Sequence, residues 1–283
     1  MIINTNNIVT VIELMDVQLR NELFVHNGEL QTKKLWENTY IKHQIDKRKQ
    51  SGEFSLTDNI RAMVYSMVSA GMAWERVERG IDEATGRILP IDEIFFQYEP
   101  NAILQCSPEK LRDDLKGFGC ATSFTLNQMK ALIGTNIPKL LQIEEQYGSI
   151  DGLYQKFIDE DSTLKSLVKA LSDRNSEYKF AQMEGALVAE YLKNIGYEIA
   201  KPDRHIRRIL GSDILGLSDR KEVPVYDSID IVSEIAAKTG KSAAEVDYIL
   251  WSYCATGYGE ICTKQSPRCD ICVAKQYCKK GNS

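Results

Sequence analysis

The sequence lacks a run of apolar residues that could cross a membrane, since charged side chains interrupt every window of about 18 residues. Its first residues, MIINTNNIVTVIELMDV, lack both a basic segment and a small-residue cleavage site, which argues against a secretory signal. Internal repeats and low-complexity tracts are also missing. We therefore expect an intracellular globular protein with no membrane partner.

Basic residues are outnumbered by acidic ones, and the formal net charge of -5 argues against a surface that is basic overall. The chain of 283 residues, 43% hydrophobic and 27% charged, can bury the core of one domain or of two domains sharing a cleft. The local charge of some segments is positive even though the total charge is negative. Basic residues gather at Lys47–Lys49, at Lys201, Arg204, Arg207 and Arg208, and at Lys264, Arg268, Lys275, Lys279 and Lys280. Each stretch alone is typical of a solvated surface, but three together favour a molecule with one basic side.

Strand-like alternation is scarce, and the hydrophobic pattern is mostly helical. We expect a buried helix within 56–80, capped by Thr57 or Asp58, and two helices over 126–147 broken near 134–138. A further helix is expected over 178–194, closed by Gly196, and another after the capping box of Ser242 and Glu245. The polar stretch 44–54 is the best linker candidate.

Seven cysteines are an odd number, which a disulfide framework would not leave, and an intracellular location favours metal binding. Four of them, Cys262, Cys269, Cys272 and Cys278, are separated by six, two and five residues. A structural zinc site usually takes two C-x2-C pairs, whereas here one pair is flanked by single cysteines. This spacing suits an iron-sulfur cube, with zinc as the alternative. The remaining cysteines are expected in the core: Cys106, Cys120 and Cys254.

The C-x6-C-x2-C-x5-C pattern, placed after a predicted helix, resembles the four-iron four-sulfur loop of the endonuclease III branch of the helix-hairpin-helix DNA glycosylases. A second similarity lies upstream in IAKPDRHIRRIL, where Asp203 and His205 match the family's catalytic Asp and following His, with Gly196 before them. The resemblance implies that Asp203 is the catalytic carboxylate. An Asp at this place is also an ordinary helix N-cap, and both roles can hold together.

The family's hairpin is only partly present in KFAQMEGALVAEYL, which has one glycine, Gly185, where two are expected. Either Gly185 or Leu187 takes the position of the lysine found in members that also cleave the strand, so no amine is available for a Schiff base. Lys179 and Lys193 lie nearby in the sequence and are expected at the surface. Because Glu184 would bring a carboxylate close to a DNA phosphate, binding is expected to rest more on the basic segments.

These residues imply a monofunctional DNA glycosylase that flips a damaged or modified base out of double-stranded DNA. Asp203 would stabilise the oxocarbenium-like sugar and orient water, leaving an intact abasic site. The alternative is a non-catalytic iron-sulfur DNA-binding protein descended from a glycosylase. A third reading is an interaction module with a zinc loop.

The identity of the removed base is inferred from the segment SMVSAGMAW. This segment resembles the one with which the family fills the gap left by a flipped base. Met72 or Trp74 could be the wedge, that is, the side chain inserted into this gap, although either could equally be a buried core residue. Gly71 stands where the family often has Gln, and Met67 stands where the adenine-removing branch has Glu. The residue at 67 argues against adenine as the base that is removed. Alkylated purines are favoured, stacked on aromatic side chains such as Trp74, Tyr65 or Trp251.

The resemblance implies an all-α fold with two lobes and a four-iron four-sulfur cofactor. One lobe would comprise 1–54 and 197–283, with the cysteine loop at 262–278, and the other would be a helical barrel over 55–196 with a degenerate hairpin at about 180–190. The active site would lie in the cleft between them. DNA-contacting residues would be Gly185, Arg204, His205, Arg207, Lys264, Arg268 and Lys275. We expect a monomer, either nucleoid-associated in a cytoplasm or nuclear.

Overall fold

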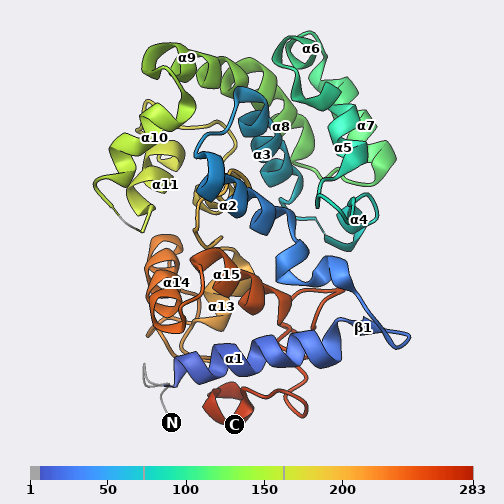
Figure 1. Cartoon of the computed structure of the whole chain (residues 1–283), viewed down its shortest axis with the longest axis vertical. Coiled ribbons are helices and arrows are strands. Elements are labelled where there is room, and N and C mark those ends of the chain that lie inside the picture. The colour runs from blue at the N-terminus through green and yellow to red at the C-terminus, as the bar shows by residue number, and fades with distance from the viewer. Residues whose placement is uncertain (1–6, 73, 162, 283) are drawn as a thin grey trace. The chain divides into compact units, whose positions relative to one another are not determined.

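A computed structural model describes residues 7–72, 74–161 and 163–282, which form two compact units (Figure 1). The split unit joins the chain up to Thr39 with the chain from Glu198 onward, and the central unit is Tyr40–Tyr197. The described residues are mostly helical, with longer irregular stretches around 195–203, 210–224 and 253–274. Among the described helices, none combines the length and the apolar composition that a bilayer-crossing segment needs.

The split unit is built around four helices, a small hairpin and short turns of 3-10 or π helix. The helices are α1 (Ile8–Gln18), α13 (Arg204–Ile209), α14 (Val225–Thr239) and α15 (Ala243–Ser252). The antiparallel hairpin consists of β1 (Val25–His26) and β2 (Glu29–Leu30). The short turns are Leu19–Leu23, Thr32–Lys34, Trp36–Asn38, Lys275–Tyr277 and Lys280–Asn282.

The core of the split unit is the apolar interior shared by α1, α13, α14 and α15. Helix α1 contributes Ile8, Val11, Ile12 and Met15, which lie on one stripe because the spacing follows the helical period. The polypeptide after α15 has little regular structure, yet Cys262, Cys272 and Cys278 pack against this core. A chain segment from the far C-terminal end is thus held by the N-terminal helix.

The central unit contains the remaining helices. They are α2 (Tyr40–Ser51), α3 (Leu56–Val68), α4 (Trp74–Glu78), α5 (Leu89–Ile94), α6 (Pro100–Leu104), α7 (Pro108–Phe118), α8 (Thr125–Ala131), α9 (Ile137–Tyr147), α10 (Ile150–Ile158), α11 (Lys165–Ser172) and α12 (Gly185–Asn194). Short turns occupy Phe96–Tyr98 and Leu132–Asn136, and an isolated bridge joins Ile81 to Ile88.

Helix α3 is buried along most of its length, as its sequence predicts, and packs closely against α12. Several polar groups inside this contact are paired. The Tyr191 hydroxyl donates to Asn59 Oδ1, and the Tyr154 and Tyr191 hydroxyls are 2.7 Å apart. Asn194 Nδ2 donates to the Ala62 carbonyl at 3.3 Å. Because buried polar groups must be satisfied, this network fixes the register of α3 on α12.

Several predicted boundaries are wrong. The N-cap of α3 is Ser55, which accepts from Asp58 N and completes a capping box, rather than Thr57 or Asp58. The expected break at 134–138 is a π-helical turn that joins α8 to α9 without an interruption. Residues 178–184 form turns, so the expected helix over 178–194 starts at Gly185. The capping interaction at Ser242 is confirmed, since its side chain accepts from Glu245 N.

The predicted linker at 44–54 is wrong as well, because most of it belongs to α2. Lysine, glutamine and arginine are good helix formers, so a polar stretch can be helical when one face finds a partner. Here Ile45 is buried, and α2 packs against α12. The two units therefore divide at 39/40 and 197/198, whereas the sequence placed α2 in the other lobe.

Candidate functional site

The cysteine loop, residues 262–278, begins where the chain folds back on the end of α15. The Tyr253 carbonyl accepts from Ile261 N at 3.0 Å and from Cys262 N at 2.9 Å. A Cβ on Gly259 would stand 2.9 Å from the Ser252 carbonyl oxygen, so only glycine fits this close approach. The loop is thereby fixed at its first cysteine.

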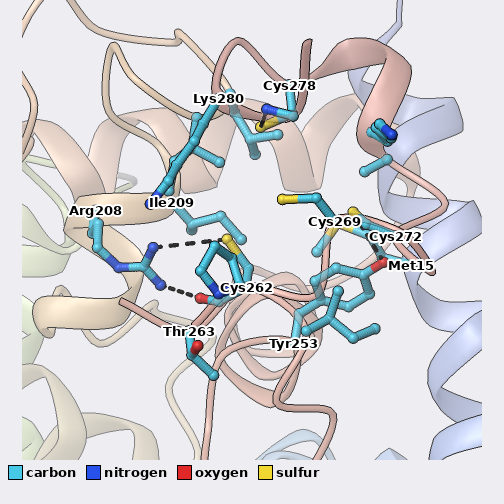
Figure 2. A pocket seen from close by; sticks show the side chains of 17 residues that line it. Met15, Arg208, Ile209, Tyr253, Cys262, Thr263, Cys269, Cys272, Cys278 and Lys280 are labelled. Carbon is cyan, nitrogen blue, oxygen red and sulfur yellow. Dashed lines mark hydrogen bonds between the residues drawn. The ribbon is translucent and has the colours of Figure 1, made fainter. Parts of the chain in front are cut away.

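All four predicted ligand cysteines line one partly open pocket, as Figure 2 shows for Cys262, Cys269, Cys272 and Cys278. All four are free thiols and half-buried. The rest of the lining is mostly apolar and comes from Met15, Ile209, Ile214, Leu215, Ile261 and Ala274, with Arg208, Lys275 and Lys280 beside it.

The described residues contain no group of three or more Cys, His, Asp or Glu side chains arranged for a single metal ion. The four thiols do share one partly open pocket whose lining is mostly apolar and includes basic side chains. A four-iron four-sulfur cluster held by four thiolates carries net negative charge, and an apolar wall with nearby cations suits such a group. The donor set therefore fits the cofactor that the sequence predicts, and the cofactor itself stays a prediction.

An arginine, a tyrosine and a backbone amide are among the groups that reach the cysteine sulfurs. Arg208 Nη1 lies 3.7 Å from Cys262 Sγ, and its Nη2 donates to the Cys262 carbonyl (Figure 2). The Tyr253 hydroxyl is 3.6 Å from Cys272 Sγ. The backbone amide of Gly281 donates to Cys278 Sγ at 3.4 Å. Hydrogen bonds of this kind orient metal ligands and stabilise the thiolate form.

A fifth cysteine, Cys254, lies in the core as predicted and also beside this set. It is 2% exposed, and Arg208 Nη2 is 3.5 Å from its sulfur. The Cys254 thiol as hydrogen-bond donor and the Arg208 guanidinium outweigh burial and lower the pKa of Cys262 to about 6. Burial raises the pKa of the Cys272 and Cys278 thiols. Cys120 is buried as expected, whereas Cys106 is only half-buried.

Asp203 is the N-cap of α13. Its Oδ1 accepts from His205 N at 2.7 Å and from Ile206 N at 3.1 Å. Both bonds use the same oxygen, so capping does not engage Oδ2. The same short helix carries Arg208 at its other end, where it contacts Cys262. One helix therefore connects the predicted catalytic carboxylate to the cysteine loop.

The other predicted residues of α13 differ in role. Arg204 is exposed, and His205 is half-buried. Burial lowers the pKa of His205, an effect that the Asp203 carboxylate partly offsets. Arg207 Nε donates to the Val223 carbonyl at 2.7 Å, which ties it to the following loop. Arg207 thus has a structural contact that the sequence did not reveal.

The cysteine loop itself presents cations to solvent. Lys264, Arg268 and Lys275 are all exposed. The stretch at Lys47–Lys49 is different, because Arg48 pairs with Asp151 at 3.1 Å and packs over the Phe54 and Tyr197 rings. Arg48 therefore stabilises the central unit and does not contribute a free basic face.

The degenerate hairpin is a turn between α11 and α12. Gln182 adopts a left-handed conformation with φ of 59°, and Phe180 and Met183 on either side of it are buried. Glu184 is the N-cap of α12, makes no capping bond and is 83% exposed. Gly185 is the first residue of α12 and is half-buried.

The two lysines near the hairpin both have partners. Lys179 Nζ donates to the Ser172 carbonyl at 2.5 Å and lies 3.4 Å from Glu184 Oε1. Lys193 is 8% exposed and pairs with Glu190 at 3.0 Å, so the expectation that it lies at the surface is wrong. Its ammonium lies against that carboxylate inside the central unit.

The wedge candidates are half-buried, with Met72 just before α4 and Trp74 at its first residue. Tyr65, proposed as a stacking residue, is a core residue. It is 4% exposed, donates to Asp92 at 2.6 Å and accepts from Ile88 N. Trp251 packs against Tyr258 in an edge contact with ring centroids 4.7 Å apart.

Gly185 belongs to the central unit and Asp203 to the split unit, so the active-site cleft between the lobes stays a prediction. No family model matches this sequence, and no curated protein matches it. A structural search found the 8-oxoguanine glycosylase/lyase of Methanocaldococcus jannaschii, solved in complex with 15mer DNA containing 8-oxoguanine. The two chains are 18% identical, with a TM-score of 0.47 over 78% of this chain and 95% of that chain. A likeness at this level assigns no activity to the chain.

Proposed function

We propose that this protein is a monofunctional DNA glycosylase with a four-iron four-sulfur cluster bound by Cys262, Cys269, Cys272 and Cys278. The observation that carries the proposal is helix α13, which has Asp203 at its first turn and Arg208 in contact with Cys262 at its last. The two motifs that resemble the glycosylase family lie far apart in the sequence and meet through this helix.

Asp203 supplies the chemistry of the proposed reaction. When the glycosidic bond breaks, positive charge develops on the sugar, and a carboxylate beside C1′ stabilises that charge and orients a water molecule. The hydrogen bonds from His205 N and Ile206 N fix the carboxylate in one rotamer without using Oδ2. The pairing of Lys193 with Glu190 and of Lys179 with Ser172 favours water over lysine as the nucleophile.

The cluster, when bound, would hold the cysteine loop in a defined shape that presents Lys264, Arg268 and Lys275 to DNA phosphates. Arg204, exposed on α13, would add to this basic surface. The net charge of -5 makes such a local surface necessary for any contact with a polyanion.

The test is a panel of duplexes with modified bases, assayed for alkali-labile abasic sites. We expect Asp203→Asn to lower the rate about 10²- to 10³-fold, the loss typical of one electrostatic stabiliser, while DNA binding is kept. Asparagine caps helices as well as aspartate does, so folding is retained. Asp270→Asn, which removes an exposed carboxylate of the cysteine loop, is the control. Full activity in Asp203→Asn would contradict the mechanism.

The non-catalytic alternative predicts no abasic sites with any duplex in the panel and unchanged binding in both variants. The exposed Glu184 carboxylate at the start of α12 is the observation that favours this alternative. A glycosylase hairpin would place its amides against a phosphate there, and a carboxylate opposes that contact.

A further inference from the structure

Gln18 is a polar side chain on the apolar stripe of α1. It follows Ile8, Val11, Ile12 and Met15 on the buried face and is 3% exposed. A buried amide is costly unless both its oxygen and its nitrogen find partners. The partners of Gln18 therefore show what this position is for.

Those partners surround the third cysteine of the loop. Gln18 Nε2 donates to the Ile271 carbonyl at 2.7 Å, and its Oε1 accepts from Val273 N at 3.4 Å. Ile271 and Val273 are the two neighbours of Cys272, so α1 holds the backbone on both sides of that residue. The amide side chain thus works as a clamp on the middle of the cysteine loop.

The oxygen of Gln18 also accepts from the Tyr253 hydroxyl at 2.5 Å. That hydroxyl has a second possible acceptor, Cys272 Sγ at 3.6 Å. A hydroxyl carries one hydrogen, so the two acceptors compete for it, and the shorter contact to Gln18 takes the larger share. Tyr253 is 1% exposed, which leaves little room for water to change this balance.

We propose that Gln18 and Tyr253 are positioning residues for the metal centre, with Gln18 withholding the Tyr253 hydroxyl from Cys272 and thereby setting the centre's reduction potential. This inference rests on the proposed four-iron four-sulfur cluster. A hydrogen bond to a ligand sulfur stabilises the more negative, reduced state and makes the potential more positive. The strength of the hydrogen bond from Tyr253 to Cys272 is controlled by the competing acceptor, Gln18 Oε1 on α1.

The proposal predicts opposite effects for the two side chains. Gln18→Leu keeps a similar volume and frees the hydroxyl for Cys272, so the reduction potential should rise. Tyr253→Phe removes the hydroxyl, so the potential should fall below that of the wild type. The double variant should match Tyr253→Phe, because without the hydroxyl Gln18 has nothing to withhold. The measurement is an anaerobic spectroelectrochemical titration of the purified full-length protein.

Tyr277→Phe is the matched control, since it removes a hydroxyl from the same loop, and its potential should equal the wild type's. If Gln18→Leu fails to take up iron, Gln18→Glu replaces it. This variant keeps the acceptor and adds negative charge, so its potential should fall. The inference would be overturned if the potentials of Gln18→Leu and Tyr253→Phe shifted in the same direction, or if neither shifted. A rise of the potential in Gln18→Glu would overturn it as well.

Failure of the proposed cofactor is distinguishable from failure of this inference. A wild-type protein without iron and acid-labile sulfide refutes the cluster and the inference with it. A wild-type protein that contains the cluster but shows none of the expected shifts refutes only the roles of Gln18 and Tyr253.

Discussion

Gly196 shows how one residue fixes the end of a helix. It follows α12 with φ of 83°, and its amide donates to the Lys193 carbonyl at 3.0 Å. A Cβ here would meet the Gln44 carbonyl oxygen and stand 2.9 Å from Arg48 Cβ. The glycine is therefore required both by its left-handed backbone and by the close approach of α2.

We expect Gly196→Ala to lower the free energy of unfolding by about 2–4 kcal/mol, combining left-handed strain with a backbone clash. Gly148→Ala is the control, because Gly148 has a similar φ of 77° and open space around its Cβ position. That variant should lose only about 1 kcal/mol. Urea unfolding measures both, and equal losses would show that contact with α2 is unimportant.

At the residue scale the sequence predicted Asp203 as an N-cap, and the structure confirms it. Motif spacing was enough there because a cap depends on residues next to it in the chain. Arg207 and Lys193 could not be assigned in that way, since their partners depend on how the chain folds around them. Gln18 did leave a signal, a polar residue on an apolar stripe, but its partners lie at the other end of the chain, 235 to 255 residues away.

At the scale of elements, the turn before α12 combines two unfavourable features. Gln182 has a positive φ, which a non-glycine residue adopts at a cost of about 1 kcal/mol or more. Glu184 places an exposed carboxylate at the helix N-terminus, where the helix dipole stabilises it but a phosphate would be repelled. Under the proposed function both features lie where DNA would be clamped.

We expect Glu184→Gln to tighten binding to duplex DNA by about 1 kcal/mol, roughly fivefold, at low salt, because one like charge near a phosphate is removed. Glu160→Gln, an exposed acid elsewhere in the central unit, is the control for net charge. Fluorescence anisotropy over a series of salt concentrations measures both. Equal effects of the two variants would mean that the turn does not meet DNA.

The elements themselves were only partly predictable. Helix α3 follows from its apolar period, although its N-cap is Ser55, and the helix after Ser242 follows from its capping residue. Helix α2 was taken for a linker because its polar residues hide the single stripe that includes Ile45. The start of α12 was placed too early, since Phe180 and Met183 are buried in a turn and mimic a helical face. In both wrong predictions, α2 and the start of α12, tertiary packing decided the structure.

At the scale of the whole molecule, the two units depend differently on the proposed cluster. The cysteine loop packs on the core of the split unit and contains one short 3-10 turn. Such a segment has few backbone hydrogen bonds of its own, so ligand bonds to a cluster would supply much of its order. The central unit contains none of the four cysteines proposed as ligands.

We therefore expect iron removal by oxidation and chelation to increase amide hydrogen exchange most in residues 262–278 and next in α1, whose Gln18 clamp loses its fixed partner. Exchange in α3 and α12 should change little, because their shared tyrosine and asparagine network lies wholly within the central unit. Mass spectrometry of exchanged peptides, with metal-restored protein as the control, provides the measurement. Equal protection of the cysteine loop with and without iron would contradict this prediction, because it would mean that packing against the core orders the loop without any ligand bonds.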